Sequence, residues 1–267
     1  MLHFGPFVLF SNWIAGTLLA FAVCAMLLRR FWKTWRERQE LDSEFQAASE
    51  MQQLLVPAAS GSAGFHVASA YLPAKHVGGD FFWTIPSADG SLLLVTGDVS
   101  GKGLRAAMTV ATLAGALRNE PSREPARVLE RLNRVLLDEK TRGFTTCCAA
   151  LFHPDGLLNI ANAGHIAPWL NGCELPVGPG LPLGITPEAE YAARTFSLQP
   201  SDRLTFVSDG VVEARNPAGE LYGFERTREL AAQTTAPQIA ETAREFGQED
   251  DITVITIERI AEVAHAA

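Results

Sequence analysis

The stretch Gly97-Asp98-Val99-Ser100-Gly101-Lys102-Gly103 separates two segments of different character. Before it, Ser91–Thr96 (SLLLVT) is a short, mostly aliphatic run, which is typical of a buried strand. After it, Leu104–Leu117 (LRAAMTVATLAGAL) lacks proline and is rich in Ala and Leu, which predicts a helix. An ionised carboxylate at the end of a buried strand needs a partner, because desolvating it alone is costly. Asp98 therefore indicates a ligand site, and a divalent cation is the natural candidate.

A nucleotide-binding P-loop is the main alternative for this stretch, since it also joins a strand, glycines, a Gly-Lys pair and a helix. A P-loop requires Ser or Thr directly after the lysine, and this sequence has Gly103 there. The first glycine also lies too close to Lys102. The sequence therefore argues against a P-loop.

Composition limits the class of protein. The chain has 267 residues, enough for a short N-terminal module and one domain with a sizeable core. Its formal net charge of −8 argues against nucleic acid as a partner, because phosphate backbones require a basic surface. The four cysteines (Cys24, Cys147, Cys148 and Cys173) show no CxxC spacing, so we expect reduced thiols and no zinc site.

The N-terminal segment predicts a membrane anchor. Residues 7–28 carry no formal charge and would form a helix of roughly 33 Å, long enough to span the hydrocarbon core. A cleaved signal peptide would place basic residues before this run, whereas here they follow it, at Arg29, Arg30, Lys33, Arg36 and Arg38. We therefore expect a single-pass protein of the cell (inner) membrane, with residues 1–6 outside and the rest cytoplasmic.

A connector follows the predicted anchor, over residues 29–57. Within it, Glu37–Leu55 contains neither Gly nor Pro and favours a helix that Pro57 ends. Two readings stay open, a helix that packs on its own domain and a helix that forms a homodimer. The remaining residues predict a globular domain over 58–260 and a tail over 261–267.

Three further acidic positions resemble Asp98 in their surroundings. Asp80 directly follows two glycines, Asp209 follows the apolar strand predicted at Arg203–Val207, and Asp250-Asp251 precedes the strand predicted at Ile252–Ile257. Each acid therefore lies at a predicted strand end beside Gly or another acid. Together they form a constellation of carboxylates.

The rest of the domain is predicted to contain strands with helices bunched between them. Pro154-Asp155-Gly156 is a turn signal between the strands predicted at Phe144–Phe152 and Leu157–Ala161, so we assign Asp155 to a hairpin turn. His165 in Asn162-Ala163-Gly164-His165 is interpreted as a hydrogen-bonded structural residue. The other expected segments are a strand at His66–Leu72, a strand at Ile166–Leu170, a loop at Asn171–Pro187, and helices at Glu124–Glu139, Phe224–Ala232 and Gln238–Phe246.

A set of motifs in this order resembles the SpoIIE/RsbU-type bacterial serine phosphatases, a branch of the PPM (protein phosphatase 2C-like) family. They are GGDFFW (78–83), GDVSGKGLRAAM (97–108), NAGH (162–165), GLPLG (180–184), SDGVVEARNPAGELYGFER (208–226) and EDDITVITI (249–257). The resemblance covers about Ala47 to Glu258. It implies an α+β fold, a PPM-type layered sandwich of two packed antiparallel sheets flanked by helix pairs.

The resemblance also implies a site and a reaction. The carboxylates of Asp80, Asp98, Asp209 and Asp250, with the carbonyl of Val99, would bind two Mn²⁺ or Mg²⁺ ions, and Asp251 is the alternative to Asp250. All-oxygen ligands select such hard cations. The implied reaction is hydrolysis of phosphoserine or phosphothreonine by a metal-bound hydroxide, on a regulatory protein of the anti-sigma-factor-antagonist type.

Two other functions stay open, a catalytically silent PPM-like module that only binds a partner and a small-molecule phosphohydrolase. The sequence also departs from many eukaryotic relatives, which have an Arg before the first metal-binding Asp. Here Lys75 and His76 precede Asp80. For Lys75 and Lys102 two interpretations remain: the lysine steers the phosphate, or it is a solvated residue of a loop.

Overall fold

The computed structural model describes residues 19, 21, 23–36, 39, 64–74, 77–138 and 143–260. The chain divides into two compact units, Met1–Ala47 and Ala48–Ala267. In the first unit, residues 23–36 are helical. Within the described residues, no helix combines the length and apolarity needed to cross a membrane. Most of the anchor predicted at 7–28 and of the connector predicted at 29–57 lies outside the described residues.

The second unit contains two five-stranded sheets, and every strand pair in them is antiparallel. The first sheet has the spatial order β1 (Phe65–Leu72), β10 (Ile252–Arg259), β9 (Arg203–Val207), β6 (Trp169–Leu170) and β7 (Cys173–Glu174). The second has the order β2 (Asp80–Pro86), β3 (Leu92–Val99), β4 (Thr145–Phe152), β5 (Leu157–Ala163) and β8 (Arg194–Ser197).

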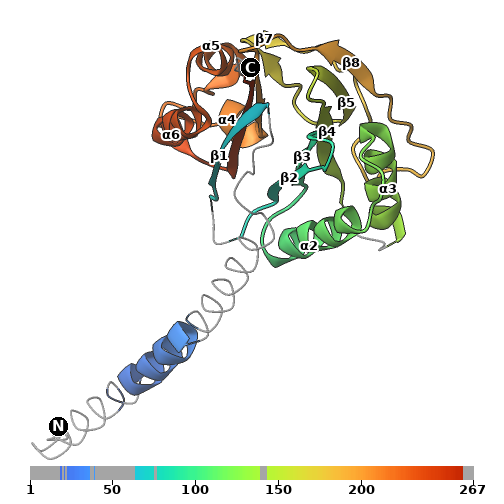
Figure 1. The fold of residues 1–267 in the computed structure, drawn as a ribbon. Coiled ribbons are helices and arrows are strands. Elements are labelled where there is room, and N and C mark those ends of the chain that lie inside the picture. Colours follow the sequence, from blue (N-terminus) through green and yellow to red (C-terminus); the bar gives the residue numbers. More distant parts are fainter. Residues whose placement is uncertain are drawn as a thin grey trace, which may run out of the picture. The chain divides into compact units, whose positions relative to one another are not determined.

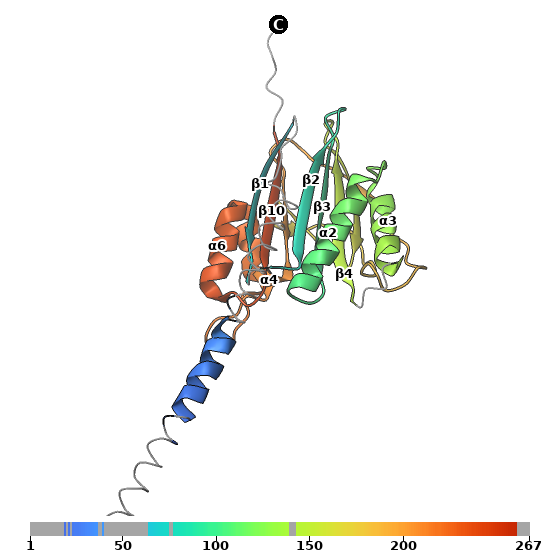
Figure 2. The same cartoon turned by 90° about the horizontal axis from the view of Figure 1, so that it is seen from below.

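The two sheets pack face to face, and helices cover their outer faces (Figure 2). Helices α2 (Leu104–Arg118) and α3 (Pro125–Asp138) lie on the second sheet. Helices α4 (Asp209–Val212), α5 (Gly223–Gln233) and α6 (Ala236–Gly247) lie on the first sheet (Figure 1). The architecture is therefore an α+β sandwich of four layers, as the family resemblance implied.

Strand β3 shows why the quoted stretch determines this arrangement. Leu92 and Leu94 belong to the core between the sheets, whereas Leu93 and Val95 pack against α2 and α3. Successive side chains of a strand point to opposite faces, so a strand covered on both faces needs an unbroken apolar run. SLLLVT supplies that run, and all of these leucines are fully buried.

Most predicted elements occur within a few residues of their expected positions, but the edges of the sheets differ from expectation. The strand expected at Ile166–Leu170 is limited to Trp169–Leu170, and the loop expected at Asn171–Pro187 contains β7. Strand β8 was not predicted at all. Strands β6, β7 and β8, of which β7 and β8 are edge strands, span only two to four residues. They are too short to show the run of alternating side chains that identifies a strand in sequence.

Asp155 occupies the turn between β4 and β5, as predicted. Its Oδ1 accepts a hydrogen bond from the backbone N–H of Leu157 at 2.9 Å. This local bond stabilises the hairpin turn. Asp155 is therefore a turn residue, separate from the acidic constellation.

Candidate metal centre

Side-chain alternation directs two of the predicted acids into the space between the sheets. On β3, Asp98 lies an even number of residues from Leu92 and Leu94, so its side chain points to the same face of the sheet, toward the inter-sheet core. On β2, Asp80 lies two residues before Phe82, so both side chains point to the face that packs in this core. Asp80 and Asp98 are also direct partners in the pairing of β2 with β3. The two carboxylates therefore lie side by side at one end of the sandwich.

The first sheet contributes hydroxyl groups to the same end. Thr253 Oγ1 on β10 donates a hydrogen bond to Asp80 Oδ2 at 2.6 Å. Ser208, directly after β9, accepts from the N–H of Thr253 at 2.9 Å and donates to the carbonyl of Asp251 at 3.1 Å. Asp80 is only 1% exposed, so this bond from Thr253 satisfies one oxygen of a buried carboxylate. The bond also connects the two sheets.

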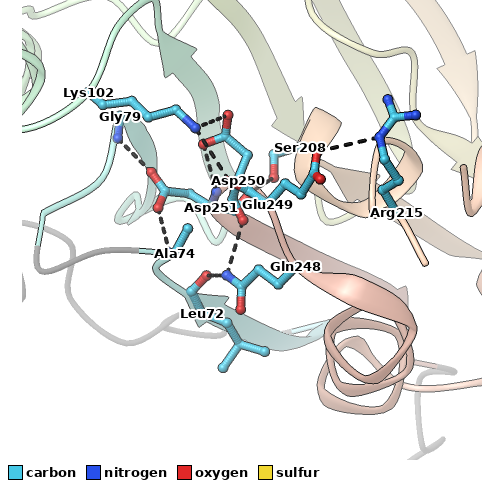
Figure 3. A network of polar contacts seen from close by, with 10 residues as sticks. All are labelled: Leu72, Ala74, Gly79, Lys102, Ser208, Arg215, Gln248, Glu249, Asp250 and Asp251. Atoms are coloured by element: carbon cyan, nitrogen blue, oxygen red, sulfur yellow. Dashed lines mark hydrogen bonds and ion pairs between the residues drawn. The ribbon is translucent and has the colours of Figure 1, made fainter. Parts of the chain in front are cut away.

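Asp251 fixes the loop before β2. Its Oδ1 accepts from the N–H of Ala74 at 2.9 Å and its Oδ2 accepts from the N–H of Gly79 at 2.8 Å (Figure 3). Gly78 lies so close that an added Cβ would overlap Asp251 Oδ2, which explains the glycine at this position. Both oxygens of Asp251 are therefore used to hold the backbone that leads into Asp80.

Asp250 differs from its neighbour in exposure and in partner. Its carboxylate is half-exposed, and Oδ2 lies 2.7 Å from Lys102 Nζ (Figure 3). Lys102 also donates weakly to the carbonyl of Glu249 at 3.4 Å. Asp250 Oδ1 accepts from the N–H of the adjacent Asp251 at 2.9 Å, so this side chain makes one local backbone hydrogen bond and one ion pair with a half-exposed cation.

Asp209 and the Val99 carbonyl complete the predicted set. Asp209 is the first residue of α4, directly after β9. An added Cβ on Gly79 would lie 2.6 Å from Val99 O and 2.8 Å from Asp98 Oδ1, so these two oxygens flank the same point. The N–H of Val99 donates to the carbonyl of Gly79 at 3.1 Å, which holds this close approach in place.

The electrostatics indicate an excess of negative charge. Burial, followed by the charge of Asp98, raises the pKa of Asp80 well above its ordinary value. Burial, followed by the charges of Asp209, Asp250 and Asp251, raises the pKa of Asp98 to about 7. The pKa of Asp209 is also raised, first by burial and then by Glu213 and Asp250. The carboxylates therefore lie close enough to repel one another.

The donor chemistry fits a hard divalent cation, because carboxylate and carbonyl oxygens are the ligands that Mg²⁺ and Mn²⁺ prefer. Within the described residues, however, no three His, Cys, Asp or Glu side chains are arranged as a ready ligand set. Asp250 is paired with Lys102, and the carboxylates repel one another. The fold thus brings the predicted acids to one end of the sandwich without closing them around a common point.

His165 is buried and hydrogen-bonded. The backbone N–H of His165 donates to Asn162 Oδ1 at 3.0 Å, and its backbone carbonyl accepts from Asn162 Nδ2 at 2.9 Å. The ring nitrogen Nδ1 lies 3.0 Å from Thr146 Oγ1. Burial lowers the pKa of the imidazole to about 4, so the ring is neutral near pH 7. These contacts agree with the structural role predicted for His165. Lys75 and His76 lie outside the described residues.

The sequence pattern did not single out Ser208, Thr253 or Tyr71, which also lie at this end of the sandwich. Thr253 is two residues after Asp251, which directly precedes β10, so both side chains are expected to point to the same face of the sheet. This spacing is the signal that could have identified Thr253. The pairing of β1 with β10 brings Tyr71 to this end of the sandwich, where it is the direct partner of Thr253. No local pattern predicts that pairing.

Comparison with known proteins places these features in a family. The family model for Stage II sporulation protein E (SpoIIE) matches residues 88–260. The phosphoserine phosphatase RsbU of Bacillus subtilis (strain 168) is 27% identical over 241 residues, covering 83% of this chain and 72% of RsbU.

Solved structures show the same fold. The SiaA-PP2C domain of Pseudomonas aeruginosa superposes with a TM-score of 0.70 at 21% identity, covering 84% of this chain and 98% of that domain. The PP2C phosphatase domain of SpoIIE from Bacillus subtilis, solved with a fragment of its regulatory domain, gives a TM-score of 0.60 at 18% identity. That match covers 74% of this chain and 64% of the SpoIIE chain.

Proposed function

The chain belongs to the SpoIIE family of PP2C-type phosphatases, and from this premise we propose that it is a metal-dependent serine/threonine phosphatase acting on a phosphorylated regulatory protein. The observation that carries the proposal is the gathering of Asp80, Asp98, Asp209 and Asp250 at one end of the sandwich, where burial and mutual repulsion raise the pKa values of the first three. Such a concentration of buried acids disfavours the fold unless a cation neutralises it.

We assign the four carboxylates and the Val99 carbonyl as the groups that hold two Mn²⁺ or Mg²⁺ ions. Ions of this kind supply water activation and charge neutralisation at the phosphoryl group when they are bound. The chain's own contribution is positioning. Thr253 orients Asp80 through its 2.6 Å hydrogen bond, and Asp251 holds the loop that brings Gly79 against Val99.

The contrast between Asp250 and Asp251 decides which of the two we assign as a ligand. The carboxylate of Asp251 holds the amides of Ala74 and Gly79 in a distant loop, whereas that of Asp250 accepts only from the adjacent N–H of Asp251 and pairs with the half-exposed Lys102. An exposed ion pair contributes little to stability and is readily exchanged. Asp250 is therefore free to turn from Lys102 to a cation.

Replacing each of these acids by Ala separates the proposed role of Asp250 as a metal ligand from that of Asp251 in holding the loop before β2. Asp250→Ala is expected to remove hydrolysis and weaken Mn²⁺ binding while changing metal-free stability by no more than about 0.5 kcal/mol. Asp251→Ala is expected to lower metal-free stability by about 1–3 kcal/mol, because the buried amide of Gly79 and the amide of Ala74 lose their acceptor. Unfolding in chelator and Mn²⁺ titration by calorimetry measure both effects. The opposite pattern, with Asp251→Ala losing only Mn²⁺ binding, would reverse the assignment.

A phosphoprotein substrate is supported by the resemblance to RsbU, whose name describes a phosphoserine phosphatase. A cavity of about 350 Å³ also lies beside the loop that carries Val99, with Lys102 and Arg105 among its lining residues. Cationic side chains next to the acids favour an anionic substrate segment. We propose a phosphorylated protein of the anti-sigma-factor-antagonist type as the substrate.

The substrate class is tested by comparing phosphopeptides and phosphoproteins with small phosphorylated metabolites in the presence of Mn²⁺. We expect kcat/KM to be highest on the protein substrates. Higher values on metabolites would identify a small-molecule phosphohydrolase instead. Intact Mn²⁺ binding without hydrolysis of either class would identify the silent, partner-binding module.

The membrane anchor predicted at residues 7–28 is a separate proposal, supported by its lack of charge and by the basic residues that follow it. Expressed in cells, the full chain is expected to stay in the membrane fraction after a carbonate wash, whereas a chain starting at residue 58 is expected in the supernatant. Release of the full chain by carbonate would contradict the anchor. The proposed homodimer through residues 29–57 is tested by the solution mass of the same two chains.

A further inference from the structure

The hydroxyl of Tyr71 is a buried polar group without a partner. Tyr71 is the second-last residue of β1, and its side chain packs against the core between the sheets. Its hydroxyl oxygen is inaccessible to solvent and has no hydrogen-bond partner among the described residues. A buried hydroxyl without a partner costs about 1–3 kcal/mol, so such a group calls for a physical explanation.

The position of this hydroxyl links it to the acidic end of the sandwich. Tyr71 is the direct partner of Thr253 in the β1–β10 ladder, and Thr253 donates to Asp80. An added Cβ on Gly78 would collide with both the Tyr71 hydroxyl and Asp251 Oδ2. The two oxygens therefore both lie close against the backbone of residue 78, which leaves no room for a side chain there.

The groups around Tyr71 are already engaged with other partners. Asp251 uses its two oxygens for the amides of Ala74 and Gly79, and Asp80 Oδ2 accepts from Thr253. Burial, followed by the charges of nearby carboxylates, raises the pKa of the phenol, so Tyr71 keeps its proton at physiological pH. A neutral phenol both donates and accepts hydrogen bonds, so it suits a water molecule as its partner.

We propose that Tyr71 is a positioning residue whose hydroxyl accepts a hydrogen bond from a water in the hydration shell of a cation held by Asp80 and Asp98. This inference rests on the proposed function, because it needs a divalent cation at the site. Hard cations such as Mg²⁺ keep several of their waters in protein sites, and those waters need partners from the protein. Groups that contact a metal's ligands in this way tune its affinity.

Tyr191 provides a matched control. Its hydroxyl is also buried and has no partner among the described residues, but it lies in the core between the second sheet and helices α2 and α3. Replacing either tyrosine by phenylalanine removes one buried, unpaired oxygen and leaves the ring in place. The two variants therefore differ in whether the oxygen faces the acidic end of the sandwich.

The experiment measures the Mn²⁺ dissociation constant by calorimetry, and the thermal unfolding midpoint in chelator and in saturating Mn²⁺. Tyr71→Phe is expected to weaken Mn²⁺ binding about tenfold while its midpoint in chelator stays equal to or above that of the wild type. Tyr191→Phe is expected to bind Mn²⁺ as the wild type does. A purely structural role for Tyr71 would instead lower its midpoint equally in both conditions, with unchanged affinity, and would overturn the inference.

Three further outcomes are distinguishable. If Tyr71→Phe binds Mn²⁺ normally but binds inorganic phosphate more weakly in its presence, the hydroxyl contacts a phosphoryl oxygen and the inference about hydration is wrong. If the wild type itself does not bind Mn²⁺, the proposed function fails and the inference fails with it. Normal binding by the wild type and by both variants overturns only the role of Tyr71.

Discussion

Asp98→Asn is expected to abolish phosphate ester hydrolysis while making the metal-free protein more stable at pH 8. Asn keeps the size of Asp and one acceptor oxygen but carries no charge, so it is a poor ligand for a hard cation. Cation chemistry of this kind contributes several kcal/mol to the transition state, so we expect kcat to fall by about 10³-fold or more. A phosphopeptide assay with Mn²⁺ measures this loss.

The stability effect follows from the raised pKa of Asp98. The folded protein holds this proton with a pKa of about 7, against an ordinary value of 3.8, so the Asp98 carboxyl favours the fold most at low pH. That stabilisation is lost as the pH rises from about 4 through 7, because the partly buried carboxylate then becomes charged. Asp98 is partly exposed, so solvent reduces the effect to the order of 1–3 kcal/mol.

Unfolding of Asp98→Asn and the wild type in chelator, measured between pH 4 and pH 8, tests this expectation. The variant should gain stability relative to the wild type as the pH rises, and the difference should be smallest near pH 4. Asp155→Asn is the matched control, because Asp155 serves a hairpin turn and its replacement should leave hydrolysis unchanged. Retained hydrolysis by Asp98→Asn, or a difference in stability that does not depend on pH, would contradict the assignment.

Removing divalent cations is expected to have an equally large effect on the wild type. Excess chelator should reduce hydrolysis to background, because the acids alone offer neither a nucleophile nor positive charge for the phosphoryl group. Mn²⁺ or Mg²⁺ should restore it, and Mn²⁺ should raise the unfolding midpoint at pH 8 by neutralising Asp80 and Asp98. Activity that persists in chelator, with no metal found in the protein by mass spectrometry, would refute the proposed mechanism.

The family resemblance implied the layered arrangement of two sheets, and individual buried strands were predictable because burial on both faces restricts residue type. A continuous apolar run marks β3, a run rich in β-branched residues marks β10, and proline, glycine and aspartate mark the β4–β5 turn. The short edge strands β7 and β8 leave no such trace, since backbone pairing alone defines them. Their positions depend on where the neighbouring strand ends.

The acidic residues of the candidate site were predicted from the sequence, but the hydrogen-bonding residues that position them were not. Glycine beside aspartate at a strand end is visible in sequence, which identified Asp80 and Asp98. The bond from Thr253 to Asp80 and the pairing of Tyr71 with Thr253 join residues from opposite ends of the domain. Such contacts depend on strand register, which a single sequence does not specify.

The pairing of β1 with β10 has a consequence for biosynthesis. These strands are the first and the last of the domain, and they align from Phe65 with Arg259 to Leu72 with Ile252. A nascent chain therefore leaves the ribosome with Asp80 and Asp98 already made but without the hydroxyl of Thr253 and the loop anchor Asp251. The proposed metal centre therefore has its full set of supporting groups only once translation has reached the last strand of the domain.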